Sequence, residues 1–241
     1  MDEIKWNSNS GIVLKKLAPL SNYTSGSIEF KCGGTLIDLQ FILTSAHCVD
    51  HINFVILGDR DISLKSSSNS RQYFNISKHI PHELYLPTMK YHDIALIKLS
   101  RPAMISENVR PALLPSIDGN KDRNDSIFII AGWGAIGPYE GFEEKLRKVE
   151  LKSYTNDYCK KVGSSGLPYG INETLLFCAG DENKDTCEGD SGGALVTNSS
   201  NLFTIFGIAT SGQGCGLGVP GLYVNVFHYV NWIKETIRRN M

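Results

Sequence analysis

Short apolar runs rich in β-branched and aromatic residues recur along this chain, and each is bounded by Gly, Pro, Asn or Ser. Such runs are typical of β-strands, and their spacing predicts an all-β barrel or sandwich. The clearest runs are Phe41–Thr44, Phe54–Leu57, Ile94–Leu99, Ser126–Ala131, Leu202–Ala209 and Gly221–Val226. The chain has 241 residues, of which 41% are apolar, so it is long enough and apolar enough for a packed core.

The C-terminal stretch has a different periodicity. Val230, Ile233 and Ile237 fall at i, i+3 and i+7, which indicates one face of a helix, and basic residues follow near its end. The sequence therefore predicts a single closing helix over about residues 229–239, and a loop over Lys161–Leu167, which contains glycines.

Cysteines and glycosylation sequons point to an oxidising, secretory compartment. The cysteines are Cys32, Cys48, Cys159, Cys178, Cys187 and Cys215, and the sequons begin at Asn22, Asn75, Asn124, Asn172 and Asn198. No CxxC pair supports a zinc or thioredoxin-type site, although N-x-S/T triplets also arise by chance. A net charge of −1 without a basic block argues against nucleic-acid binding, and no apolar run is long enough for a membrane helix.

The segment Gly189–Gly193 (Gly-Asp-Ser-Gly-Gly) places a serine among glycines. A serine hydroxyl is a poor nucleophile at neutral pH and needs an adjacent base, together with backbone donors for the charge that develops on a substrate oxygen. Flanking glycines let backbone N–H groups and a substrate carbonyl approach closely. The same five residues could instead form a tight turn between strands.

A base and an acid are available elsewhere. His47 lies at the end of an apolar strand, beside a cysteine, and Asp93 opens a buried strand. A buried acid needs polar partners, and a histidine with backbone donors would supply them. The remaining histidines lack such a context: His51, His79, His82 and His228 are interpreted as structural, and His92 is expected to be exposed.

These segments, in the order His, Asp, Ser, resemble the chymotrypsin/trypsin family of serine proteases. Further matching segments run in family order over nearly the whole chain: Cys32–Ile37, Ala131–Gly134 and Pro220–Tyr223. The subgroup with the greatest similarity is the catalytic domain of arthropod clip-domain proteases of the Snake and Persephone type. The implied fold is two packed antiparallel β-barrels with a C-terminal α-helix and a cleft between the barrels. The peptidase domain would cover 11–241, with barrel one over about 11–115 and barrel two over about 116–226.

The resemblance implies a serine endopeptidase that works through an acyl-enzyme. Ser191 would attack the scissile carbonyl, His47 would take and later return its proton, and Asp93 would orient the imidazole. The N–H groups of Gly189 and Ser191 would form the oxyanion hole.

The resemblance also assigns a specificity pocket, with Asp185 at its base and Gly212 and Gly221 in its walls. A carboxylate at the bottom of a narrow slot favours Arg or Lys before the scissile bond, because an apolar guest would leave that charge unpaired. The alternative is a solvated loop acid, since Asp181 and Glu182 lie nearby.

Sequence alone does not choose among the possible cysteine pairings. The family pattern implies disulfides Cys32–Cys48, Cys159–Cys178 and Cys187–Cys215. Each could stabilise the fold by about 2–4 kcal/mol.

The family's activation segment has no counterpart in this sequence. Members are cut before an Ile-Val-Gly-Gly-like segment, whose new amino group pairs with the acid before the nucleophile, here Asp190. Residues 1–10 are polar, unlike a signal peptide, and Gly11-Ile12-Val13 lacks both a preceding basic residue and the glycines. Either the domain begins upstream of this sequence, or the chain is a silent homologue that acts as a binding or adaptor protein. We expect weak or no activity from this sequence alone, because a buried Asp190 without a partner would leave the oxyanion hole disordered.

No cofactor is expected. Asp59 and Asp61 resemble a calcium-binding loop, but hard cations usually need more oxygen ligands than two acids supply. The leading function is a limited cut after Arg or Lys in an extracellular cascade, by a monomer with protein substrates, an activating protease and protein inhibitors as partners. No nucleic-acid or membrane partner is expected. A disulfide-bonded secreted β-domain without enzymatic ancestry is the remote third alternative.

Overall fold

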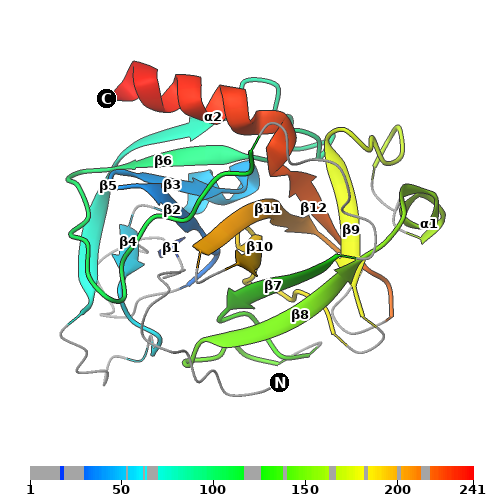
Figure 1. The fold of residues 1–241 in the computed structure, drawn as a ribbon, viewed down its shortest axis with the longest axis horizontal. Helices are drawn as coiled ribbons and strands as arrows, with labels where there is room; N and C mark the ends of the chain where they lie inside the picture. Colours follow the sequence, from blue (N-terminus) through cyan, green and yellow to red (C-terminus); the bar gives the residue numbers. More distant parts are fainter. Residues whose placement is uncertain are drawn as a thin grey trace.

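Two antiparallel β units and a C-terminal helix make up the fold (Figure 1). The computed structural model describes residues 17–18, 30–52, 54–61, 63, 70–116, 126–137, 140–162, 167–181, 184–199, 202–212 and 218–241. The predicted all-β class, with two barrel-like units and a closing helix, is confirmed; one unit is a closed barrel and the other a half-barrel.

The half-barrel is a six-stranded sheet in the order β1-β4-β5-β6-β3-β2. Its strands are β1 (Leu17–Ala18), β2 (Thr35–Asp38), β3 (Phe41–Thr44), β4 (Phe54–Leu57), β5 (Gln72–Pro81) and β6 (Ala95–Leu99). The apolar runs β3 and β6 pair with each other, for example through Leu43 and Leu96, and are almost entirely buried. Their buried ends lead directly into the segments that carry His47 and Asp93.

The second unit is a closed barrel in the order β10-β11-β12-β9-β8-β7. Its strands are β7 (Ile127–Gly132), β8 (Arg147–Ser153), β9 (Leu176–Gly180), β10 (Ala194–Ser199), β11 (Leu202–Ser211) and β12 (Gly221–Asn225). Pairing of Val196 with Ile129 joins β10 to β7 and closes the ring. The segment before β10 contains Ser191, so the two units present their functional segments toward each other.

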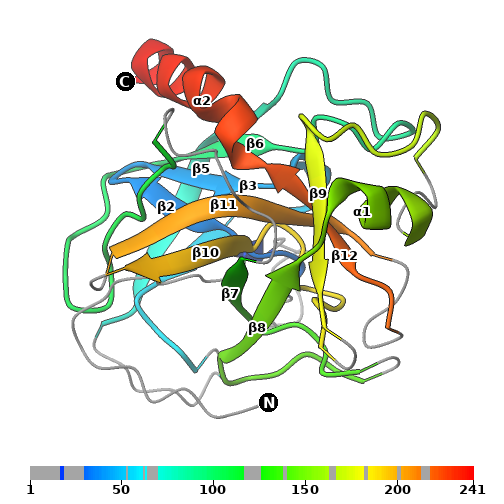
Figure 2. The ribbon, with the colours of Figure 1, turned by 45° about the vertical axis from the view of Figure 1, so that its right-hand side comes forward.

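The helical content exceeds the single predicted helix. The closing helix α2 spans Val226–Asn240, a 3₁₀-helix follows β3 at Ala46–His51, and a short helix α1 spans Asn156–Val162. Thr155 begins α1 because its carbonyl accepts the Cys159 N–H (3.0 Å) and its hydroxyl accepts the Tyr158 N–H (3.4 Å). Figure 2 shows α1 beside β9.

One apolar cluster joins the two units. It contains Phe41 and Leu96 from the half-barrel, Ile208 and Val224 from the closed barrel, and Ile233 from α2. Because the units share this core, their relative position is fixed by packing as well as by the chain that links them. Among the described residues, no helix is long and apolar enough to cross a lipid bilayer.

Candidate active site

His47 and Asp93 form a hydrogen-bonded pair. His47 lies in the 3₁₀-helix that follows β3, and its Nδ1 is 2.7 Å from Asp93 Oδ2. The backbone N–H of His47 donates to the other carboxylate oxygen at 2.8 Å. The Asp93 side chain is 4% exposed and that of His47 is 35% exposed. A buried acid therefore faces a half-exposed imidazole, which leaves Nε2 as the nitrogen available to a reacting group.

The closed barrel completes the surroundings of Asp93. Thr210, near the end of β11, donates its hydroxyl hydrogen bond to Asp93 Oδ2. Three donors from two separate parts of the fold thus satisfy the oxygens of this buried carboxylate.

Ser191 lies on a turn whose backbone needs its glycines. Gly189 has φ of 89° and Gly192 has φ of 79°, conformations that side-chain-bearing residues rarely adopt. A Cβ atom on Gly192 would also collide with Thr44 Oγ1 and the Gly33 carbonyl. Within the described chain, the N–H groups of Gly189 and Ser191 donate no hydrogen bond, so both are available to a substrate oxygen.

The turn with Ser191 docks against the segment that carries His47. Gly33 N–H donates to the Ser191 carbonyl at 2.6 Å, and Cys48 Sγ is 3.8 Å from the same oxygen. Ser45 Oγ donates to the Ala209 carbonyl at 2.8 Å and ties the same segment to β11. The three predicted residues are therefore brought to one junction, although no hydrogen bond between Ser191 Oγ and His47 Nε2 is formed among the described residues.

A pocket of about 280 Å³ opens beside Ser191, and its lining is drawn from three segments: Thr186–Glu188, Ser191 and Ala209–Gly212. Asp185 precedes Thr186 of this lining and itself lines a second pocket, together with Asp190. An ideal Cβ on Gly212, in the lining beside Ser191, would lie 3.9 Å from Asp185 Oδ2. An ideal Cβ on Gly221 would sit 2.8 Å from Asp185 Oδ1, so only glycine leaves this approach open.

Asp185 is buried and only partly satisfied. Oδ1 accepts the Thr186 N–H at 2.7 Å, whereas Oδ2 is buried without a hydrogen-bond partner. Burial raises the pKa of Asp185 to about 7, against hydrogen bonds that lower it. The sequence interpretation missed two residues of this site, Thr186 and Tyr223, whose hydroxyls lie 3.1 Å apart behind the carboxylate. Two features of the sequence could have indicated them: Thr186 follows Asp185 directly, and Tyr223 is the last residue of the matching segment Pro220–Tyr223.

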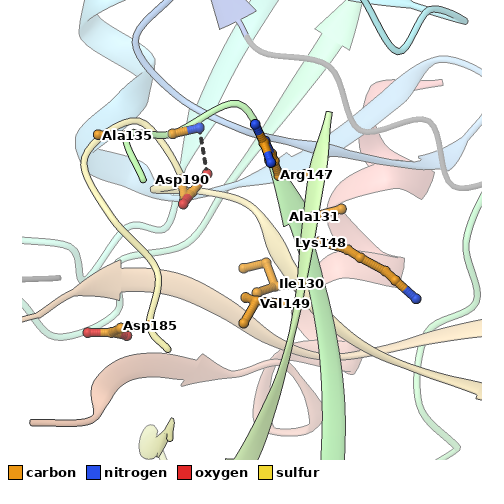
Figure 3. Close-up of a pocket in the computed structure, with 10 residues that line it drawn as sticks. Ile130, Ala131, Ala135, Arg147, Lys148, Val149, Asp185 and Asp190 are labelled. Atoms are coloured by element: carbon orange, nitrogen blue, oxygen red, sulfur yellow. Dashed lines mark hydrogen bonds between the residues drawn. The ribbon is translucent and has the colours of Figure 1, made fainter. Parts of the chain in front are cut away.

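Asp190 accepts one backbone hydrogen bond from another segment of its pocket lining, at Gly134 (Figure 3), and one from its own turn, at Cys187. Gly134 N–H donates to Oδ1 at 2.9 Å and Cys187 N–H donates to Oδ2 at 3.1 Å. Cβ atoms on Gly132 or Gly134 would collide with this carboxylate, which explains the glycines of Ala131–Gly134. Asp190 is half-buried and accepts these backbone hydrogen bonds. The expectation that the oxyanion hole is disordered without the family's N-terminal amino group stays a prediction.

Two of the implied disulfides are present, Cys32–Cys48 and Cys159–Cys178. Cys187 is also disulfide-bonded, and its implied partner Cys215 lies outside the described residues. The Cys32–Cys48 bridge lies beside His47, and because its sulfurs are bonded to each other this cluster does not offer thiolate ligands to a metal.

The oxygens of the calcium-like loop are bonded to an arginine. Arg71 donates from Nε to Asp59 Oδ2 at 2.7 Å and from Nη2 to the Asp61 carbonyl at 2.7 Å. It also reaches the Ser63 carbonyl at 3.3 Å, and the side chains of Arg71 and Asp59 are 8% and 5% exposed. In the described part of this loop, the guanidinium therefore already bonds the Asp59 carboxylate and the carbonyls of Asp61 and Ser63.

The five sequons differ in what the structure describes. Asn75 in β5 and Asn172 are exposed. Asn22 and Asn124 lie outside the described residues, and for Asn198 only the backbone, in β10, is described.

Comparison with known proteins supports a single family. The family model Trypsin matches residues 18–233. Kallikrein-8 of Rattus norvegicus is 35% identical over 213 residues, 86% of this chain and 76% of that protein. Clotting factor G beta subunit of Tachypleus tridentatus is 32% identical over 225 residues, 86% of this chain and 71% of that protein.

A longer relative matches the same region. Transmembrane protease serine 11G of Rattus norvegicus is 36% identical over 208 residues, 85% of this chain but 49% of that protein. This chain therefore spans about half the length of that relative. A match over nearly the whole sequence, together with two β units that meet at His47, Asp93 and Ser191, shows that the chain belongs to the trypsin family of serine proteases.

Proposed function

We propose that this chain is a serine endopeptidase that cleaves protein substrates after Arg or Lys. The observation that carries the proposal is the His47–Asp93 pair beside the Ser191 turn, with a buried, incompletely bonded carboxylate beside the lining of the adjoining pocket.

In this proposal Ser191 Oγ attacks the scissile carbonyl while His47 Nε2 accepts its proton. Asp93 holds the Nδ1 proton of His47 and stabilises the imidazolium. The N–H groups of Gly189 and Ser191 donate to the oxyanion, and His47 then protonates the leaving amine. Water repeats the sequence on the acyl-enzyme and releases the acid product, so the serine is regenerated.

Specificity would come from Asp185. A guanidinium or ammonium group that enters between Gly212 and Gly221 can supply the partner that Oδ2 lacks. Desolvation of an unpaired carboxylate is costly, so an apolar guest would bind without relieving that cost.

The setting we propose is limited proteolysis outside the cell, by a glycosylated protein related to arthropod clip-domain proteases. Its disulfides, the exposed Asn75 and Asn172, and the similarity to a horseshoe-crab clotting factor subunit support this setting. Its partners would be protein substrates, an activating protease and protein inhibitors.

The direct test is covalent labelling with a fluorophosphonate, followed by hydrolysis of arginyl, lysyl and phenylalanyl amides. For the domain with an Ile-Val-Gly-Gly-like N-terminus restored, we expect labelling at Ser191 and a preference for the basic amides. Ser191→Ala should abolish labelling and lower kcat by about 10⁴–10⁶-fold, the magnitude established for triads of this family.

Thr197→Ala in β10 provides a matched control, since it is a hydroxyl deletion outside the junction. Unchanged labelling in this control with none in Ser191→Ala would support the proposal. A folded protein with the restored N-terminus that neither labels nor hydrolyses any amide would instead support the silent homologue.

A further inference from the structure

Two histidines stack across the base of the loop that precedes Asp93. The loop leaves the end of β5 at His82 and returns at His92, and the backbone N–H of His82 donates to the Ile94 carbonyl at 2.9 Å. The two rings are 5.1 Å apart between centroids and 12° from parallel. His92 was expected to be exposed from the sequence, but it is half-buried by this contact.

Helix α2 holds the stacked pair from the other side. Tyr229 Oη is 2.9 Å from His92 Nδ1, and the Tyr229 ring meets His82 edge-on at 5.2 Å. Trp232 packs on His82 with ring centroids 4.9 Å apart, and its indole N–H donates to Glu83 at 2.9 Å.

The backbone at His92 makes its position sensitive to these contacts. His92 has φ of 55°, in the left-handed region that costs energy for most residues but is tolerated more often by Asn, Asp and His. The residue that follows is Asp93, and the Ile94 N–H donates to the His92 carbonyl at 2.8 Å, which tightens the turn around Asp93. A fixed His92 therefore fixes the direction from which Asp93 reaches His47.

We propose that His92 is a positioning residue for Asp93, held in place by its stack with an uncharged His82 and by Tyr229. This inference rests on the proposed function of Asp93 as the acid of the triad. It assigns catalysis-supporting roles to two histidines that touch neither the substrate nor the reacting atoms.

The stack favours uncharged rings. The Leu84 N–H donates to His82 Nδ1 at 3.2 Å, and this nitrogen can accept the bond only while it is unprotonated. Two imidazolium rings at this separation would also repel each other. Burial lowers the pKa of both histidines, and the charge of His228 on α2 lowers both further.

Acidic groups near the pair oppose this effect. Glu83, on the same loop as His82, raises the pKa of both histidines. Asp93 adjoins His92 in the chain, and Arg239 of α2 lowers the pKa of Glu83. The net direction is downward, so the pair stays neutral at neutral pH and gains charge only in acid, where the stack and the position of Asp93 would loosen.

Variants of His92 test the positioning role in the full chain. His92→Ala removes the ring contacts and suits the left-handed backbone poorly, so we expect kcat for an arginyl amide to fall about 10- to 100-fold at pH 8 with little change in KM. His92→Asn tolerates this backbone and can accept from Tyr229, so it should restore most of kcat. Equal kcat in wild type and His92→Ala would overturn the proposal.

The pH profile separates positioning from simple stability. Acid lowers the activity of any enzyme that needs a general base, whichever residue is at position 92, but only the wild type also charges the stacked pair. The ratio of kcat at about pH 5 to kcat at about pH 8 should therefore be several-fold higher in His92→Asn than in wild type. Identical ratios, with a change only in Tm, would show that His92 is merely structural.

A spectroscopic readout keeps this inference distinct from the proposed function. The low-field proton NMR signal of His47 Nδ1–H reports its bond to Asp93 whether or not the protein turns over a substrate. We expect His92→Ala to shift or broaden this signal and His92→Asn to restore it. An inactive protein that shows this pattern would refute the proposed function alone, whereas an unchanged signal would refute the positioning role.

Discussion

Asp185, the proposed specificity acid, is a residue whose burial is unfavourable for the stability of the fold. Asp185 is buried, its Oδ2 has no partner, and its pKa is raised to about 7 by burial. A raised pKa means that the folded state holds this proton more tightly than the unfolded chain. The stability contributed by the bound proton is present below the unfolded pKa of 3.8 and is lost as pH rises through about 7.

Asp185→Asn should consequently separate activity from stability. Above pH 7 we expect a higher Tm than wild type, with a gain on the order of a few kcal/mol that disappears near pH 4. Hydrolysis of arginyl amides should fall at least a hundredfold, because a neutral amide offers a cation no ion pair. Thermal unfolding at both pH values and amide kinetics check this, and equal Tm values at pH 8 would contradict the account of burial.

At the scale of single residues, the sequence was most informative for candidate site residues that lie within short recognisable motifs. His47, Asp93, Ser191 and Asp185 could be proposed from residue type, order and spacing, and the structure brings them to one junction. The partial burial of His92 could not be predicted from the sequence, because it depends on Tyr229, which is 137 residues away in the sequence.

At the scale of elements, apolar strands were predictable and polar ones were not. The runs that became β3, β4, β6 and β7 are rich in β-branched or aromatic residues and are mostly buried. By contrast, β5 (QYFNISKHIP) and β8 (RKVELKS) are largely polar, and their pairing with β4, β6 and β7 supplies the order that their composition does not. The short α1 escaped prediction because seven residues give little periodicity.

The loop between β4 and β5 is an element held by a buried ion pair. Arg71→Gln would leave the Asp59 carboxylate buried without its cation, so we expect the free energy of unfolding to fall by about 3–5 kcal/mol. Because the guanidinium already bonds the loop oxygens, the Tm of the wild type should be the same in calcium and in a chelator. Denaturant unfolding and thermal melts test both points.

Arg110→Gln is the control for the loss of one positive charge, since Arg110 is exposed and its one bond within the described residues is a long one to the Ser106 carbonyl. It should change stability by less than about 0.5 kcal/mol. A wild-type Tm that rises with millimolar calcium would contradict the role assigned to Arg71.

At the scale of the whole molecule, the candidate site depends on both β units, and neither unit alone contains all of its residues. His47 and Asp93 belong to the half-barrel, whereas Ser191, Thr210 and Asp185 belong to the closed barrel. Helix α2 continues directly from β12 of the closed barrel and crosses to the half-barrel (Figure 1), where Lys98 Nζ donates to the Asn240 carbonyl. The relative position of these residues is therefore a property of the assembled fold.

A smaller side chain in the core where α2 meets both units should therefore destabilise both units together. Ile233 is fully buried in the shared cluster, so Ile233→Ala should lower the free energy of unfolding by about 2–5 kcal/mol. Arg238→Ala, at a side chain that is 72% exposed on the same helix, should change it by less than about 0.5 kcal/mol. Calorimetry of both variants should show a single transition, with activity lost over the same temperature range. Two resolved transitions in Ile233→Ala would mean that the halves fold independently, and the junction would then depend on local contacts such as Ser45 with Ala209 instead of the common core.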